Sequence, residues 1–407
     1  MIQRICVAIC VAIILALCIS GCGNSGAIVS SAVATIAAIT PEPTATLPAR
    51  PTPTIIGTDT PVATAQPDYT TINTQVDAFF GTFITPQTPG GVVIVLKDGQ
   101  IVHQAAYGMA NLKKKTPNTV DTAFHIGSIF KQMTAMCIMM LAEQGKLDYD
   151  DPVSTYIPEL TKLDNTMTIR QLLQHTSGLP NWDDGITDAL FAKSAQPTNA
   201  DMVALLSRKR KLHTAPGSEF YYSNTGYDML AVVVERISGE TFPQFVQTHI
   251  LDTLGMTHTL LVADTPPRKR TTVAVSYTGS TDQPEPNDDD SFNQLYGASG
   301  IYTTVGDMAL YDEALYGDTL VTQKTYKEAL KQTVLNDGSR EPYGFGLELL
   351  RWHKESYVAH SGIFLAYHSS YVRFPKQHFS VIVLLNRDYD YPDDPRLALQ
   401  VAEFYLR

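Results

Sequence analysis

Hydrophobic positions change their spacing along the chain, and each change predicts a different kind of element. A short helical pattern of apolar residues precedes a predicted strand over Gly91–Lys97, which is apolar up to Leu96. Asp98-Gly99 follows and leads into a second predicted strand over 100–107, which is typical of a β-hairpin closed by a tight turn. Further strands are predicted near the C-terminus, before a helix over about 395–406: Tyr343–Leu350, Tyr357–Ser361, Leu365–Phe374 and Phe379–Asn386.

The middle of the chain, from about 148 to 290, has helical spacing with loops. Thr168 and Gln171 form a capping box that opens a short helix, a polar helix is expected over about 198–211, and another helix ends at Gly239. Strands at both ends and helices between them predict an α+β domain. We expect one antiparallel β-sheet flanked by helices, with an inserted, mostly helical subdomain.

One helix is apolar almost all round, which predicts burial. It covers Gln132–Glu143, ends before Gly145, and is preceded by Ser128 and Lys131. Residues three apart on a helix lie on one face, and burial lowers the pKa of an ammonium group. Lys131 could therefore act as the base that activates a Ser128 nucleophile. The same spacing also describes a capping serine beside a solvated lysine.

The N-terminal residues differ from the rest in composition. Residues 1–22 carry one basic residue, an uncharged apolar stretch that is short for a membrane span, and the ending Ile19-Ser20-Gly21-Cys22. This ending resembles the cleavage site of bacterial lipoproteins, which implies a signal peptide and a lipid on Cys22; an uncleaved signal anchor is the alternative. Residues 23–68 are rich in proline and threonine and predict an extended tether. The folded domain is expected over 69–407.

Charge and cysteine content narrow the possible functions. The chain of 407 residues has a formal net charge of −11 and only short basic runs, so nucleic-acid binding is not expected. Four of the five cysteines precede residue 23, and the fifth, Cys137, is predicted to be a buried apolar residue. The ten histidines show no metal-ligand spacing. We expect no metal and no cofactor, and we expect the acidic stretch 282–290 to be a surface loop.

Three separated segments together resemble the active-site motifs of a known family. Ser128-x-x-Lys131, Tyr222-Ser223-Asn224 and His360-Ser361-Gly362 occur in the order and approximate spacing found in the serine β-lactamase and penicillin-binding-protein superfamily. The Tyr-x-Asn form of the second motif is similar to the class C β-lactamase, DD-carboxypeptidase and esterase branch. The resemblance covers roughly 70–405.

The resemblance implies a role for each motif residue. Ser128 would be acylated by the substrate. Lys131 would activate it, alone or with Tyr222, whose phenol could shuttle a proton if the lysine lowers its pKa. Asn224, His360, Ser361 and Gly362 would bind substrate, and the backbone N–H groups of Ser128 and Ile363 would form the oxyanion hole.

The third motif departs from the Lys-Thr-Gly of many β-lactamases, because a histidine that titrates near ~6.5 replaces a permanent cation. A neutral His360 that handles a proton would lose activity as the pH falls, whereas a charged His360 that binds a carboxylate would lose it as the pH rises. The resemblance implies a membrane-tethered, extracytoplasmic serine hydrolase. Its expected substrates are D-Ala cell-wall peptides or β-lactam-like amides; an esterase and a non-catalytic penicillin-binding or sensor domain are the alternatives. The oligomeric state stays open.

Overall fold

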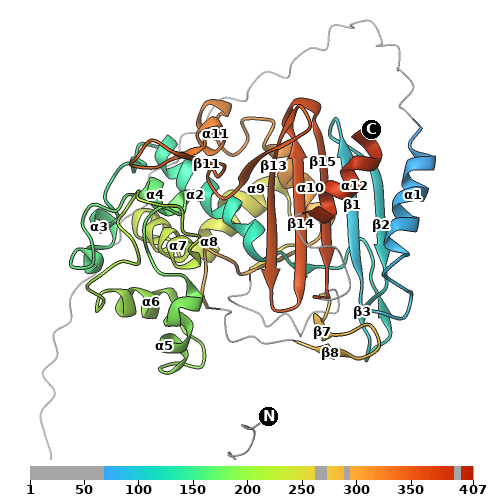
Figure 1. Cartoon of the computed structure of the whole chain (residues 1–407), viewed down its shortest axis with the longest axis horizontal. Coiled ribbons are helices and arrows are strands. Elements are labelled where there is room, and N and C mark those ends of the chain that lie inside the picture. The colour runs from blue at the N-terminus through green and yellow to red at the C-terminus, as the bar shows by residue number, and fades with distance from the viewer. Residues whose placement is uncertain (1–67, 262–272, 288–293, 389–395, 407) are drawn as a thin grey trace, which may run out of the picture. The chain divides into compact units, whose positions relative to one another are not determined.

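A six-stranded antiparallel sheet, built from both ends of the chain, is the centre of the domain (Figure 1). The computed structural model describes residues 68–261, 273–287, 294–388 and 396–406. The predicted signal peptide and all but the last residue of the predicted tether lie outside these ranges. The strand order is β12-β13-β14-β15-β1-β2, which confirms the predicted α+β architecture. Their bounds are β1 Gly91–Lys97, β2 Gln100–Tyr107, β12 Glu348–Trp352, β13 Glu355–Phe364, β14 Tyr367–Phe374 and β15 Phe379–Leu385.

The predicted hairpin is present, but one predicted strand is shorter than expected. Asp98 and Gly99 have φ of 51° and 72°, as a two-residue type I′ turn requires. The strand predicted over Tyr343–Leu350 begins only at Glu348. Gly346, with φ of 72°, explains the difference, because a Cβ there would lie 2.8 Å from the backbone carbonyl carbon of Lys131. This segment packs against the start of helix α2 (Lys131–Glu143) before joining the sheet.

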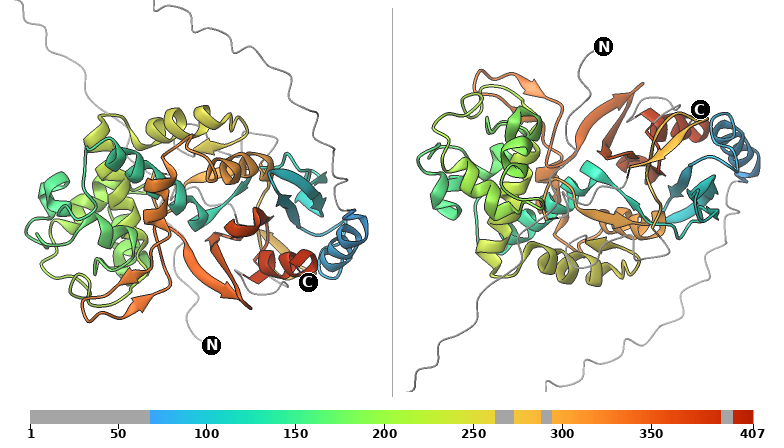
Figure 2. Two further views of the ribbon diagram at one scale, coloured as in Figure 1. Left: turned by 90° about the horizontal axis from the view of Figure 1, so that it is seen from above. Right: turned by 90° about the horizontal axis from the view of Figure 1, so that it is seen from below.

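Both faces of the sheet are covered, which explains why the interior strands β1 and β15 are apolar without alternation. Val93 and Val95 of β1 belong to a core cluster with α1 (Thr70–Phe80) and α12 (Arg396–Leu406). Val92 and Ile94 point the other way, into the larger core, where α10 (Val305–Ala314) covers the sheet. The views in Figure 2 show α12 and α10 on opposite sides of the strands.

The helical part stands beside the edge of the sheet that β12 and β13 form (Figure 1). The capping box at Thr168 is present, and α7 ends at Gly239 in the left-handed conformation. The polar helix expected over 198–211 is limited to α6. The helices of this inserted part end at Leu254, and short strands follow. The elements are α3 Val153–Tyr156, α4 Ile169–Leu173, α5 Thr187–Phe191, α6 Asn199–Leu206, α7 Asn224–Ser238, α8 Phe242–Val246, α9 Asp252–Leu254, β6 Leu260–Leu261, β7 Tyr277–Gly279 and β8 Pro284–Pro286.

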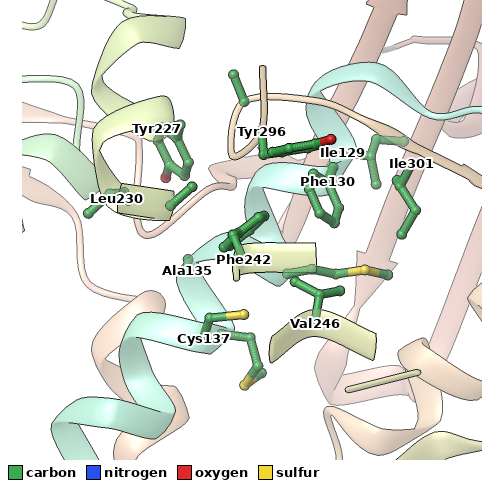
Figure 3. Packing of buried hydrophobic residues seen from close by; sticks show 14 of the residues in the cluster. Ile129, Phe130, Ala135, Cys137, Tyr227, Leu230, Phe242, Val246, Tyr296 and Ile301 are labelled. Atoms are coloured by element: carbon green, nitrogen blue, oxygen red, sulfur yellow. The ribbon is translucent and has the colours of Figure 1, made fainter. Parts of the chain in front are cut away.

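Helix α2 runs through the larger core, as its sequence predicts. Residues 131–141 are all buried, and Figure 3 shows the Ala135 and Cys137 segment of α2 beside Phe242 and Val246. Cys137 is fully buried and its thiol pKa is raised by desolvation, so it is an apolar core residue. Gly145, with φ of 68°, follows the helix end. Within the described ranges, we find no helix whose length and apolar character would suffice to cross a membrane.

Candidate active site

Ser128 and Lys131 lie at the junction of two helical segments. A 3-10 turn, η1 (Gly127–Phe130), carries Ser128, and α2 begins directly afterwards at Lys131. The sequence predicts one helix here, and the tighter first turn is the difference. Lys131 Nζ lies 2.9 Å from Ser128 Oγ. Ser128 remains partly exposed while Lys131 is fully buried, so the hydroxyl faces solvent and the amine lies behind it.

The contacts of Lys131 suit a neutral amine. Its Nζ donates to Asn224 Oδ1 at 2.7 Å and to the Ala298 carbonyl at 3.0 Å. As an ammonium, Lys131 donates in all three contacts. As a neutral amine, it donates to the two carbonyl oxygens, and its lone pair is left for the Ser128 hydroxyl. Burial lowers the pKa of Lys131 to about 7, against an opposing effect of Asp228. A substantial neutral fraction at neutral pH follows.

The second motif lies at the start of α7. Ser223 caps the helix by accepting a hydrogen bond from the Gly226 N–H, which fixes Asn224 in its first turn. The Tyr222 ring lies 5.0 Å from Lys131 Nζ. Burial raises the pKa of the Tyr222 phenol, and a hydrogen bond with Ser128 offsets only part of that rise. The direction of this shift is opposite to the lowered pKa that a Tyr222 proton shuttle would require.

The two expected oxyanion donors lie on neighbouring segments. Gly127 has φ of 51°, and a Cβ there would lie 2.7 Å from the Ile363 backbone nitrogen. The backbone of η1 therefore packs directly against β13. The N–H groups of a first helical turn have no partners within the helix. Gly362 is confined similarly, because a Cβ there would meet the Ile126 carbonyl oxygen. The atoms that crowd this glycine therefore belong to the protein itself.

His360 belongs to a buried chain of hydrogen bonds behind Tyr222. The Ser223 N–H donates to His175 Nδ1 at 3.1 Å, which leaves the proton on His175 Nε2. His175 Nε2 is 3.2 Å from the Tyr343 hydroxyl, and that hydroxyl is 3.0 Å from His360 Nε2. Burial and the nearby Lys131 lower the pKa of His360 to about 4. His360 is therefore neutral at neutral pH, which favours the first of the two roles considered above. Ser361 follows on β13 and is half-buried.

Sequence reasoning missed Asp228, a fully buried carboxyl group near Lys131. It accepts a hydrogen bond from Trp182 Nε1 at 2.7 Å. Burial raises the pKa of Asp228 to about 7, and Trp182 and Lys131 act to lower it. The available signal was its position four residues after Asn224 on an amphipathic helix, which places both side chains on one face.

A cavity of about 200 Å³ opens beside the nucleophile. Its described lining combines site residues with apolar side chains: Ser128, Trp182, Asn224, Ser299, Ile363, Phe364 and Leu365. None of these residues carries a formal charge. The described part of the chain holds no group of three or more His, Cys, Asp or Glu residues that could bind a metal ion.

Comparison with known proteins identifies the family. The Beta-lactamase family model matches residues 76–406, and the chain belongs to this family. A penicillin-binding protein of Bacillus subtilis strain 168 is 28% identical over 328 residues, which are 78% of this chain and 72% of that protein. A second protein of that strain named as a penicillin-binding protein, PbpX, is 33% identical over 260 residues, 63% of this chain and 61% of that protein.

Two solved structures have the same fold as this chain. The octameric penicillin-binding protein homologue from Pyrococcus abyssi superposes with a TM-score of 0.71 at 25% identity, covering 84% of this chain and 78% of that one. FmtA from Staphylococcus aureus gives a TM-score of 0.68 at 21% identity, covering 83% and 90%; at that identity the likeness concerns the fold alone.

Proposed function

We propose that the protein is a serine hydrolase that works through an acyl-enzyme on Ser128. The contact that carries the proposal is the 2.9 Å separation of Lys131 Nζ and Ser128 Oγ, with the two other Lys131 contacts occupied by acceptors. Lys131 takes the hydroxyl proton as Oγ attacks the substrate carbonyl. The Ser128 and Ile363 N–H groups stabilise the oxyanion. The proton then passes to the leaving group, and water later releases the acyl group.

Two substrate classes follow from different observations. Membership of the Beta-lactamase family, with relatives named as penicillin-binding proteins, supports D-Ala cell-wall peptides or β-lactam-like amides. A neutral His360 and an uncharged described lining favour a substrate without a carboxylate, because a buried carboxylate needs a charged partner. Ester hydrolysis is therefore the second candidate.

Covalent labelling tests the mechanism directly. The full chain is treated with a fluorophosphonate and, separately, with a penicillin, and the adduct is located by intact mass and peptide mapping. We expect one adduct, on Ser128, and none in Ser128→Ala. Ser356→Ala is the matched control, since Ser356 is an exposed serine at the far end of β13.

The same experiment separates the alternatives. A label on Tyr222 or Cys137, or unchanged labelling of Ser128→Ala, contradicts the acyl-enzyme. An adduct on Ser128 with no release on amides or esters would identify a non-catalytic penicillin-binding or sensor domain.

We further propose that a lipid on Cys22 holds the domain outside the cytoplasmic membrane, with residues 23–68 as the tether. The support is the small-residue ending before Cys22 and the proline-rich segment after it. Cys22→Ala should abolish lipid labelling and shift the protein from the membrane to the soluble fraction. Unaltered fractionation and labelling would contradict the anchor.

A further inference from the structure

The cavity beside Ser128 has an apolar wall made by the tip of one hairpin. Ile363 and Phe364 end β13, Leu365 follows in the turn, and all three line the cavity. Ile363 is 59% exposed, and few large apolar side chains in the described chain are as exposed to solvent. Its backbone N–H is also the expected oxyanion donor, so this wall begins at the reacting carbonyl.

Leu365 occupies a backbone position that leucine normally avoids. Phe364 pairs with Tyr367, which leaves Leu365 and Ala366 as a two-residue turn. Leu365 has φ of 53°, where glycine or asparagine is usual because a bulky side chain is strained. Strained residues gather at functional sites, and an observed outlier is a reason to look for function. Here the strained residue contributes an apolar side chain to the cavity.

Trp182 completes the apolar surface from the helical part. Its Nε1 donates to the buried Asp228, so the indole's polar group is satisfied inside the protein. The ring can then present its apolar surface to the cavity. The volume of about 200 Å³ is below the ~300–1,000 Å³ typical of drug-sized sites, which suits a small group.

We propose that this surface binds the acyl chain of the substrate, and that the preferred substrates are esters of short, uncharged aliphatic acids. The inference rests on the proposed acyl-enzyme. The bond between Ser128 Oγ and the acyl carbon forms as the ester's acyl–oxygen bond breaks, and the Ser128 proton leaves with the alcohol through Lys131. Water then adds to release the carboxylic acid. The acyl chain stays at Ser128 through both steps, so a fixed apolar wall beside the oxyanion donors contacts the chain throughout.

The test uses p-nitrophenyl acetate, propionate and butyrate, which share one leaving group and differ only in the acyl chain. Each buried methylene should raise kcat/KM about three- to fourfold, so butyrate should exceed acetate by roughly tenfold. A parallel series of acetate esters with longer alcohols keeps the acyl group constant. A chain-length preference in the alcohol series alone would overturn the assignment to the acyl group, as would a flat acyl series.

Leu365→Gly separates the proposed contact from general stability. Glycine accepts φ of 53° without strain, so the melting temperature should not fall, while the preference for butyrate should shrink to less than about threefold. Leu365→Asn keeps the number and branching of the side-chain heavy atoms at a tolerated φ but makes them polar, and it should give the same loss. His353→Gly is the matched control, because His353 has φ of 51° in the exposed β12–β13 turn, outside the cavity lining.

The outcomes are distinguishable from failure of the mechanism. Labelling of Ser128 with preserved butyrate preference in both Leu365 variants would overturn the acyl surface and leave the acyl-enzyme standing. Absence of labelling on Ser128 in the unaltered protein would contradict both the acyl-enzyme and the acyl-binding surface.

Discussion

Two fully buried pairs of an acid and a base behave in opposite ways in this domain. Arg373 on β14 and Asp312 on α10 contact each other directly, with Nε and Oδ1 2.7 Å apart and both side chains 2% exposed. Tyr371 and Ser380 also donate to Asp312. Burial acts to lower the pKa of Arg373, but the surrounding tyrosines and Asp312 outweigh burial and raise it well above its usual value.

Lys131 and Asp228 are equally buried, yet neutral groups take their nearest hydrogen bonds. Lys131 donates to an amide and a peptide carbonyl, and Asp228 accepts from an indole and, at 3.4 Å, from the Ala298 N–H. Each pKa moves to about 7 because burial disfavours the charge and no direct contact restores it. Direct contact thus keeps Arg373 and Asp312 charged inside the protein. Without direct contact, Lys131 and Asp228 can each gain or lose a proton near neutral pH.

The largest expected effect comes from removing the Lys131 amine, the proposed proton acceptor. Lys131→Met keeps a flexible side chain of similar length in the buried helix, and acylation of Ser128 should slow by ~10²–10⁴. Stability should change by less than about 1 kcal/mol, because the removed group is a desolvated amine without a charged partner in direct contact. Stopped-flow acylation and urea unfolding measure the two quantities. Labelling at the original rate would contradict the role of Lys131.

The reverse pattern is expected for the structural pair. Arg373→Met leaves Asp312 buried without its cation and should cost about 3–5 kcal/mol of unfolding free energy. Acylation per folded molecule should stay nearly constant. Arg170→Met is the control, since Arg170 is 30% exposed and pairs with the 66% exposed Asp150, and should cost about 1 kcal/mol or less. Equal losses in the two variants would refute the distinction between the pairs.

The smallest expected effect sharpens the comparison through pH. Lys131 must be neutral to accept a proton, so kcat/KM should rise with pH through about 7. A nearby negative charge favours the ammonium form, so Asp228→Asn should lower the Lys131 pKa and move this rise to lower pH, by about one unit or less. His360→Gln should leave it in place, because the His360 pKa is about 4. A rise displaced by His360→Gln and unmoved by Asp228→Asn would reverse these assignments.

The fold was largely predictable because its signals are local. The apolar runs of β1 and β15, the Asp98-Gly99 turn and the capping box at Thr168 each depend on a few neighbouring residues. The shortened β12 was not predictable, since Gly346 is constrained by contact with the distant Lys131 backbone.

The site divides in the same way. Spacing indicates Ser128, Lys131 and Asn224, and the structure brings the three within hydrogen-bonding distance. The pKa values of Tyr222 and His360 depend on burial, which only the packed structure defines. His360 also contacts Tyr343, which no motif joins to it. Asp228 shares that difficulty, because its importance comes from desolvation that only the packed structure defines.

The order of the strands also determines when the site can exist during synthesis. Strand β15 lies between β14 and β1, and Gly91 pairs with Leu385. One edge of β1 therefore stays unpaired until β15 has been made, and such a long-range closure folds slowly. Because η1 packs against β13, a nascent chain that stops before β13 lacks both Ile363 and the strand that contacts η1. The candidate site is therefore assembled only after β13 has been synthesised.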